Sequence, residues 1–232
     1  MRLKHVTFTG VDERTDLDRL QEIQKQYPYT EWGILTSYHW YENGNRYLSP
    51  QIIDKLRGRG LNMALHVCGS AAHDAAKGKW NKIRKHTLGC LWLFNRVQLN
   101  VANRQDNPLR MSSTPSLNTE LIIQQRPNKT TLYEDSKWIG EGNVSMLLDA
   151  SGGKGIDTPI VLYPSDGKIG YAGGINPDNV EEKMSFLLSH VTMGEFWIDM
   201  ESGVRTNDWF DLDKVERVLQ ICDRVIGKYV RT

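Results

Sequence analysis

The sequence predicts an α/β protein whose parallel strands close into an eight-stranded (β/α)8 TIM barrel. Short runs of strand-forming residues alternate with runs of helical periodicity along the chain, a pattern typical of parallel sheets covered by helices. In the last third, three stretches each pass from an apolar strand into a glycine-containing loop: 144–155, 169–180 and 196–205. Consecutive units of this kind near the C-terminal end are what a barrel uses to bind phosphate.

The length and composition favour one domain over residues 1–232. With 39% hydrophobic residues, the 232-residue chain can form one core of the size that a single barrel needs. Its 29 basic and 28 acidic residues give a formal net charge of +1 without a sustained run of either sign, so no nucleic-acid partner is expected. No apolar run approaches the length of a membrane span, and the basic start passes too quickly into charged residues to fit a signal peptide.

The three cysteines are Cys68, Cys90 and Cys222, which are too scattered for a metal-ligand pattern and odd in number. Free cysteines of this kind suit a reducing compartment. We therefore expect a cytoplasmic protein without a metal site.

The first half of the chain contains four predicted strands, at 5–9, 32–36, 61–68 and 96–100. Helices are predicted between them, at 15–26, at 50–56 and at 71–88. The first helix places Leu17, Leu20 and Ile23 at helical spacing. The second begins at Ser49 and Pro50, an N-cap followed by proline in the first turn, and the third is interrupted at Gly78. Residues 101–118 are polar with little periodicity, and no element is assigned to them.

The second half supplies four more predicted strands, at 120–124, 144–149, 169–172 and 195–199. Helices are predicted at 131–139, 178–189 and 211–226, and the last has a clean apolar stripe. Residues 156–168 are irregular. Strands with interleaved helices and no long linker complete the barrel, whose active site is expected at the C-terminal ends of the strands.

Asp149 is the candidate that the residues themselves single out. It ends the apolar run VSMLLD and precedes a loop of small residues, Ser151, Gly152, Gly153 and Gly155. Small residues let a loop lie close to a ligand. The plainer alternatives are that Asp149 caps the next turn and that the glycines only form turns.

Three segments of the C-terminal third carry a family resemblance. LLDASGGKG is similar to LLDS followed by GGTG, AGGINPDNV to AGGLNPENV, and IDMESGVR to VDVSSGVE. Earlier segments match more loosely: TFTGVDERTD to KICGLT, NRYLSP to SPRYVSP, and VQLN to VQLHG. In these motifs the chain resembles the phosphoribosylanthranilate isomerases, the barrel enzymes of tryptophan biosynthesis.

The resemblance implies an Amadori rearrangement, in which the ribose ring of a phosphorylated N-glycoside opens and hydrogen moves from C2 to leave an aminoketose. The chain would then be an aldose–ketose isomerase, an intramolecular oxidoreductase that needs a general acid and a general base but no metal or organic cofactor. By this resemblance Asp149 would be the general acid, and Arg46 would pair with a substrate carboxylate. Backbone amides around Gly173, Gly174, Ser202 and Gly203 would hold the phosphate, helped by the start of the helix near 176–178, and Gly153 and Gly155 would also bind the substrate.

The general base is where the sequence departs from the family pattern. The family has a cysteine directly before the first-strand glycine, and Thr9 takes that catalytic position here. A threonine hydroxyl has no useful basicity near neutral pH. Cys68, with His66 on the same strand face, and Asp12 are therefore alternative bases. The fourth strand departs as well, with QLNV in place of QLHG.

Three functions are compatible with these residues. The first is an isomerase that uses Asp149 and a relocated base. The second is a phosphometabolite-binding barrel that kept its phosphate site and lost turnover with the cysteine. The third is a phosphosugar lyase or epimerase on the same scaffold, an analogy of fold alone. All three predict a phosphorylated small molecule as the partner.

Overall fold

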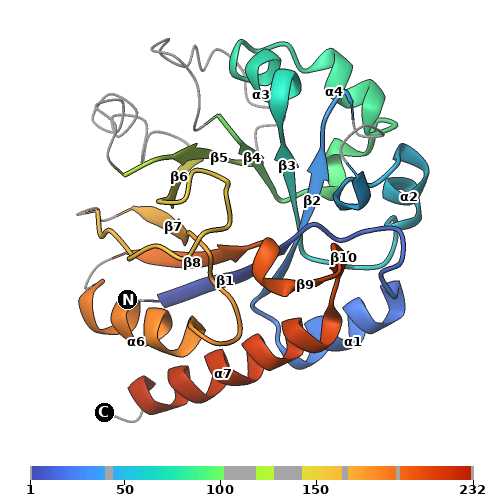
Figure 1. The fold of residues 1–232 in the computed structure, drawn as a ribbon. Coiled ribbons are helices and arrows are strands. Elements are labelled where there is room, and N and C mark those ends of the chain that lie inside the picture. Colours follow the sequence, from blue (N-terminus) through green and yellow to red (C-terminus); the bar gives the residue numbers. More distant parts are fainter. Residues whose placement is uncertain are drawn as a thin grey trace.

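The computed structural model describes residues 2–39, 44–101, 119–127, 143–163, 167–191 and 194–230. Within these ranges the long strands form one closed barrel in chain order, and each runs parallel to both neighbours (Figure 1). The barrel strands are β1 (Arg2–Thr9), β2 (Thr30–Thr36), β3 (Met63–Val67), β4 (Arg96–Leu99), β5 (Glu120–Gln125), β6 (Val144–Asp149), β7 (Lys168–Ala172) and β8 (Glu195–Met200). This confirms the predicted (β/α)8 barrel, with each strand close to its expected position.

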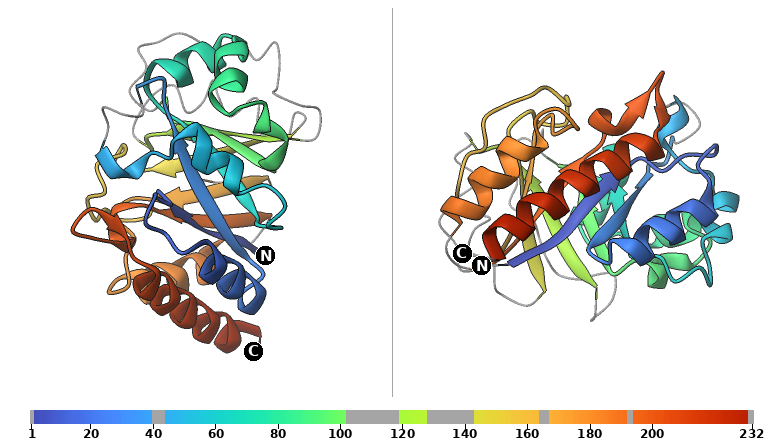
Figure 2. Two further views of the ribbon diagram at one scale, coloured as in Figure 1. Left: turned by 90° about the vertical axis from the view of Figure 1, so that its right-hand side faces the viewer. Right: turned by 90° about the horizontal axis from the view of Figure 1, so that it is seen from below.

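The described helices lie on the outside of the barrel: α1 (Leu17–Gln26), α2 (Pro50–Lys55), α3 (Gly69–Ala76), α4 (Asn81–His86), α6 (Val180–His190) and α7 (Leu212–Val230). The view from below shows α7 lying across β1, between α6 and α1 (Figure 2). The apolar stripe of α7 accounts for this position, because Val215, Val218 and Leu219 are fully buried. No helix in the described ranges is long and apolar enough to cross a membrane.

The helix boundaries follow the predicted signals with few exceptions. Asp16 caps α1 by accepting from two amides of its first turn, and Ser49 precedes the proline that starts α2. The predicted helix 71–88 is divided into α3 and α4, with the break at Gly78 as expected. The predicted helix 178–189 begins two residues later, at Val180, because 177–179 form a turn. The predicted helix 131–139 and the stretch 102–118 lie outside the described residues.

Several short elements have no counterpart in the prediction, and the largest group of them follows β8. After β8 a short 3-10 helix (Ser202–Val204) leads into an antiparallel ribbon of β9 (Arg205–Thr206) and β10 (Trp209–Phe210). Strands of this length leave no readable periodicity in a sequence.

Alternation along the strands separates two environments. Val6 and Phe8 of β1 belong to the main core between the barrel and its helices. Residues of opposite parity face the barrel interior, where Ile122, Leu147 and Trp197 form a separate buried cluster. Polar and charged side chains lie on either side of this cluster. A charged layer lies near the N-terminal ends of the strands, and a second polar layer at their C-terminal ends forms the site described next.

Candidate active site

A cavity of about 450 Å³ lies at the C-terminal ends of the barrel strands, and every strand of the barrel contributes to its lining. The lining includes every catalytic and binding residue that the sequence predicts: Thr9, Arg46, Cys68, Asp149, Gly153, Gly155, Gly173, Gly174, Ser202 and Gly203. These residues come from segments far apart in the chain, so their meeting in one cavity supports treating them as one site.

Asp149 closes β6 and is 4% exposed. Its Oδ1 accepts from the amide and the hydroxyl of Ser151, at 3.0 and 2.7 Å. Its Oδ2 accepts from Gln124 Nε2 at 2.7 Å and from the Gly153 amide at 2.5 Å. The residue thus caps the turn, as the plainer alternative supposed, and also lines the cavity with a carboxylate whose orientation is fixed.

Asp199 is a second carboxylate of the same cavity, one residue before the end of β8. Thr9 Oγ1 donates to its Oδ1 at 2.8 Å. Burial raises the pKa of Asp199 to about 6; the Thr9 hydrogen bond opposes the rise and the negative charge of Asp149 adds to it. Asp199 is therefore ionised near neutral pH but more basic than an exposed carboxylate, which suits a proton acceptor.

His66 and Cys68 also line the cavity, but neither has the electrostatics of a base. Burial lowers the pKa of His66 to about 3, so the imidazole is neutral, and Gln98 Nε2 lies 3.1 Å from its Nδ1. Burial raises the pKa of Cys68 to about 12, so the thiol stays protonated. In the part of the chain that the structure describes, no group of three or more His, Cys, Asp or Glu could hold a metal ion.

Asp12, the other alternative base, does not line this cavity. Its side chain is buried, and Oδ2 accepts from Arg205 Nη2 at 3.0 Å and from the Phe210 amide at 2.6 Å. The residue holds the β9–β10 ribbon against the end of β1. Its role is structural, which removes it from the candidates.

The glycine corner consists of Gly153, Gly155, Gly173, Gly174, Ser202 and Gly203, from the loops after β6, β7 and β8. A Cβ on Gly155 would lie 2.7 Å from Ser202 Oγ, and one on Gly174, where φ is +64°, would overlap the backbone of Asp157. One on Gly203 would overlap the carbonyl oxygen of Ile175. Gly174 and Gly203 therefore do more than form turns, because the lack of a side chain lets the loops after β6, β7 and β8 pack closely together beside the cavity.

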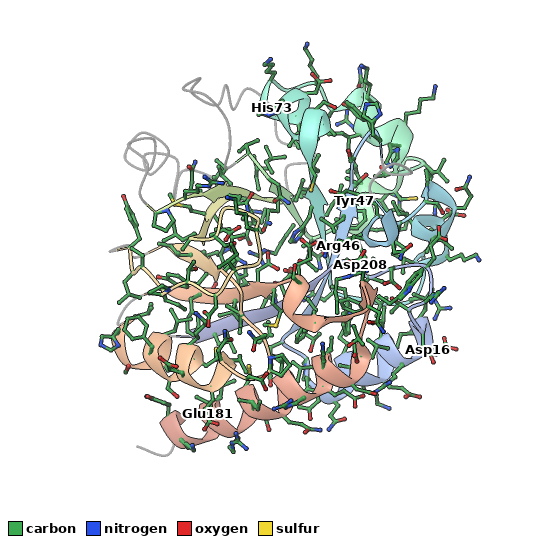
Figure 3. The ribbon with its side chains drawn as sticks, viewed as in Figure 1. Asp16, Arg46, Tyr47, His73, Glu181 and Asp208 are labelled. Carbon is green, nitrogen blue, oxygen red and sulfur yellow. The ribbon has the colours of Figure 1, made fainter. Side chains whose placement is uncertain are left out.

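Arg46 lines the cavity as predicted, yet it already has anionic partners. Figure 3 shows it beside Asp208, with Tyr47 next to it. Arg46 Nη1 donates to Glu201 Oε1 at 2.7 Å, and Nε donates to Asp208 Oδ1 at 2.8 Å. Its side chain is 34% exposed. The predicted pairing with a substrate carboxylate would compete with both contacts.

Sequence reasoning missed Asp199, Glu201 and Gln124. A signal for Asp199 was present, since it follows apolar strand residues and precedes a Ser-Gly loop, as Asp149 does. The alternation that turns Asp149 inward also applies to β8. Gln124 and Glu201 became visible only through their contacts with Asp149 and Arg46.

The fold and the site together define a β/α-barrel protein with two buried carboxylates and a glycine corner at the C-terminal ends of its strands. Residues 103–221 match the model of the N-(5'phosphoribosyl)anthranilate (PRA) isomerase family. Because this match covers more than half of the 232 residues, the chain belongs to the PRA isomerase family of tryptophan biosynthesis.

Solved structures extend the likeness over nearly the whole chain. An N-(5'-phosphoribosyl)anthranilate isomerase from Pyrococcus furiosus is 15% identical, covering 95% of this chain and 98% of its own, with a TM-score of 0.53. A phosphoribosyl anthranilate isomerase from Thermococcus kodakaraensis is 16% identical, covering 94% and 98%, with a TM-score of 0.52. At these identities the likeness shows the fold. None of the curated proteins matches the chain.

Proposed function

We propose that this chain catalyses an Amadori-type aldose–ketose isomerisation of a phosphorylated N-ribosyl substrate. The observation that carries the proposal is the pair of buried carboxylates, Asp149 and Asp199, in one cavity but in different environments. General acid–base catalysis uses two such groups in separate roles. Membership of the family supports the reaction class. We place the reaction in the cytoplasm, where free thiols such as those of Cys68, Cys90 and Cys222 stay reduced.

Asp149 is the proposed general acid. It gives a proton to the ring oxygen as the bond from C1 to that oxygen breaks, which leaves an iminium between C1 and the substrate nitrogen. The hydrogen bonds from Gln124, Ser151 and Gly153 hold the side chain in place for the transfer.

Asp199 is the proposed general base, in place of the family's cysteine. It removes the proton from C2, and the resulting enolamine becomes the aminoketose when C1 gains a proton and the C2 hydroxyl loses one. Thr9, whose hydroxyl donates to Oδ1 of Asp199, orients this carboxylate and is a positioning residue in this mechanism. The glycine corner holds the phosphate through backbone amides near the start of α6.

The proposal is tested by mixing the purified chain with N-(5-phosphoribosyl)anthranilate and, separately, with N-(5-phosphoribosyl)aniline. The reaction is followed by NMR, since C2 becomes a ketone carbon. Turnover of either compound is expected, and Asp199→Asn should lower kcat by at least about 100-fold. Absence of turnover with both, while ribose 5-phosphate still raises the melting temperature, would overturn the proposal in favour of a phosphometabolite-binding barrel.

The pH dependence of kcat/KM gives a prediction for Asp199. Protonated Asp199 cannot accept the C2 proton, so activity should be present above its pKa of about 6 and should be lost as the pH falls through that value. Below it, kcat/KM should fall about tenfold per pH unit. A profile that stays flat through this range would rule out Asp199 as the base.

Thr9→Val is expected to move this acidic limb to higher pH. The hydrogen bond from Thr9 lowers the pKa of Asp199, and a hydrogen bond to a charged group is worth about 1.5 kcal/mol or more, or about one pH unit. Thr7→Val is the matched control, because Thr7 donates to Glu31 at 2.9 Å, and its limb should stay in place. If the acidic limb of the kcat/KM profile lay at the same pH in both variants, Thr9 would not be a positioning residue for Asp199.

A further inference from the structure

Arg46 is held between two carboxylates at the mouth of the cavity. Glu201 binds its Nη1 and Asp208 binds its Nε, at 2.7 and 2.8 Å. A guanidinium offers a carboxylate two forks, Nε with Nη2 and Nη1 with Nη2. Each fork therefore has one nitrogen already bound to a carboxylate of the protein. A substrate carboxylate can bind in bidentate fashion only by displacing Glu201 or Asp208.

The charges of the described lining residues also disfavour a substrate carboxylate. Asp149, Asp199 and Glu201 are carboxylates that line the cavity, and Arg46 is the cation among the described lining residues. The charge of Glu201 also reaches the interior, where it acts on His66 and on Cys68. Like charges brought together in a cleft are repelled, with a cost of several kcal/mol when they are desolvated. A substrate that carries a carboxylate besides its phosphate is thus disfavoured at this mouth.

We propose that Glu201 determines the substrate class of this site, because the negative charge that it places in the cavity beside Arg46 excludes a substrate carboxylate. The group that lies at the mouth is instead uncharged and donates hydrogen bonds to Glu201, as a hydroxyl, an amino or an amide group does. The inference rests on the proposed function, because it takes the phosphate to be held in the glycine corner. The motif comparison agrees with it, since IDMESGVR has Glu201 where VDVSSGVE has serine.

The test uses two stable analogues that differ in one carboxylate. Reductive amination of ribose 5-phosphate with anthranilate or with aniline gives amino-ribitol phosphates with and without this group. Calorimetry should show the wild-type protein binding the uncharged aryl compound roughly tenfold more tightly, and Glu201→Gln should reduce this preference to about threefold or less by tightening binding of the carboxylate compound. The aniline compound serves as the internal reference for folding and for the phosphate site.

Asp208→Asn is the matched control variant. Asp208 pairs with the same guanidinium but does not line the cavity. This variant frees the Nε–Nη2 fork of Arg46, but it should keep most of the preference against the carboxylate, because the negative charge of Glu201 remains in the cavity. If Asp208→Asn and Glu201→Gln reduced the preference for the uncharged compound equally, the preference would depend on the freeing of Arg46 and not on the charge of Glu201 in the cavity. That result would overturn the proposal.

Calorimetry distinguishes this inference from the proposed function, because it needs no turnover. Tighter binding of the uncharged compound by a protein that turns over neither substrate supports the inference and overturns the catalytic proposal. Equal or tighter binding of the carboxylate compound by the wild-type protein overturns the inference and leaves the isomerase proposal in place. Failure of both compounds to bind overturns both.

Discussion

Asp149→Asn is expected to lower kcat by about 1,000-fold, within the range that general acid catalysis contributes. An amide cannot deliver a proton to the ring oxygen, so the first bond cleavage would have to proceed without an acid. The measurement is kcat with the N-ribosyl substrate that the wild-type protein turns over, together with the affinity for its amino-ribitol analogue. Affinity should change far less than kcat, because the phosphate is held elsewhere, in the glycine corner.

This substitution also affects stability, and the control must account for that. Each oxygen of Asp149 accepts from one backbone amide, Ser151 N on Oδ1 and Gly153 N on Oδ2. Whichever way an asparagine turns, its NH2 faces one of these amides, at a cost of about 1–3 kcal/mol. Ser151→Ala removes one donor and keeps the carboxylate, so it should lose stability with a much smaller fall in kcat. If Asp149→Asn kept more than about a tenth of kcat, Asp149 would not be the acid.

The barrel could be predicted because its signals are local. An apolar run that ends in a small or polar residue marks a strand, and repeats such as that in α7 mark a helix, without knowledge of what either packs against. Asp149 was found by the same local reasoning, from its place at the end of a strand. The β9–β10 ribbon was missed because two residues make no pattern and because it is held by Asp12, far away in the chain.

The features of the candidate site that the sequence could not give arise from contacts between distant segments. Nothing near Asp12 shows that Arg205 and Phe210 enclose it, across 193 and 198 positions of the chain. Nothing near Arg46 shows that Glu201 neutralises it. The basicity of a side chain depends on burial, which made Cys68 a plausible base in the sequence and an un-ionised thiol in the structure. Sequence reasoning therefore named residues that line one cavity, but it could not give the burial and contacts on which their proton transfers would depend.

A charged layer lies inside the barrel, near the N-terminal ends of the strands. Arg96 Nη1 donates to Glu31 Oε2 at 2.8 Å, and Arg96 Nε is 3.5 Å from Glu120 Oε1. The guanidinium stacks over the ring of Trp197, 4.1 Å from its centroid. All four side chains are buried. Burial raises the pKa of Glu31, and the positive charge of Arg96 opposes the rise.

Arg96→Leu is expected to reduce the free energy of unfolding by about 3–5 kcal/mol near neutral pH, because it leaves a buried carboxylate without its partner. This loss of unfolding free energy should depend on pH. A carboxylate whose pKa is raised by folding holds its proton more tightly in the folded state, so stability falls as the pH rises through that pKa. Since loss of Arg96 raises the pKa of Glu31 further, the deficit should be smaller at about pH 5 than at about pH 8. Denaturant unfolding at both values measures it.

Arg19→Leu separates the burial of the Arg96 pair from the loss of an arginine. Arg19 also bridges two carboxylates, Asp213 and Glu216, but its side chain is 34% exposed, so its removal should cost less than about 1 kcal/mol. The double variant Arg96→Leu with Glu31→Gln should regain part of the loss at the higher pH, because the unpaired charge is gone. Suppose instead that Arg96→Leu lowered the free energy of unfolding no more than Arg19→Leu does, or by the same amount at both pH values. Either result would mean that water or a shifted side chain compensates the charge of Glu31. The charged layer would then contribute little to the stability of the barrel.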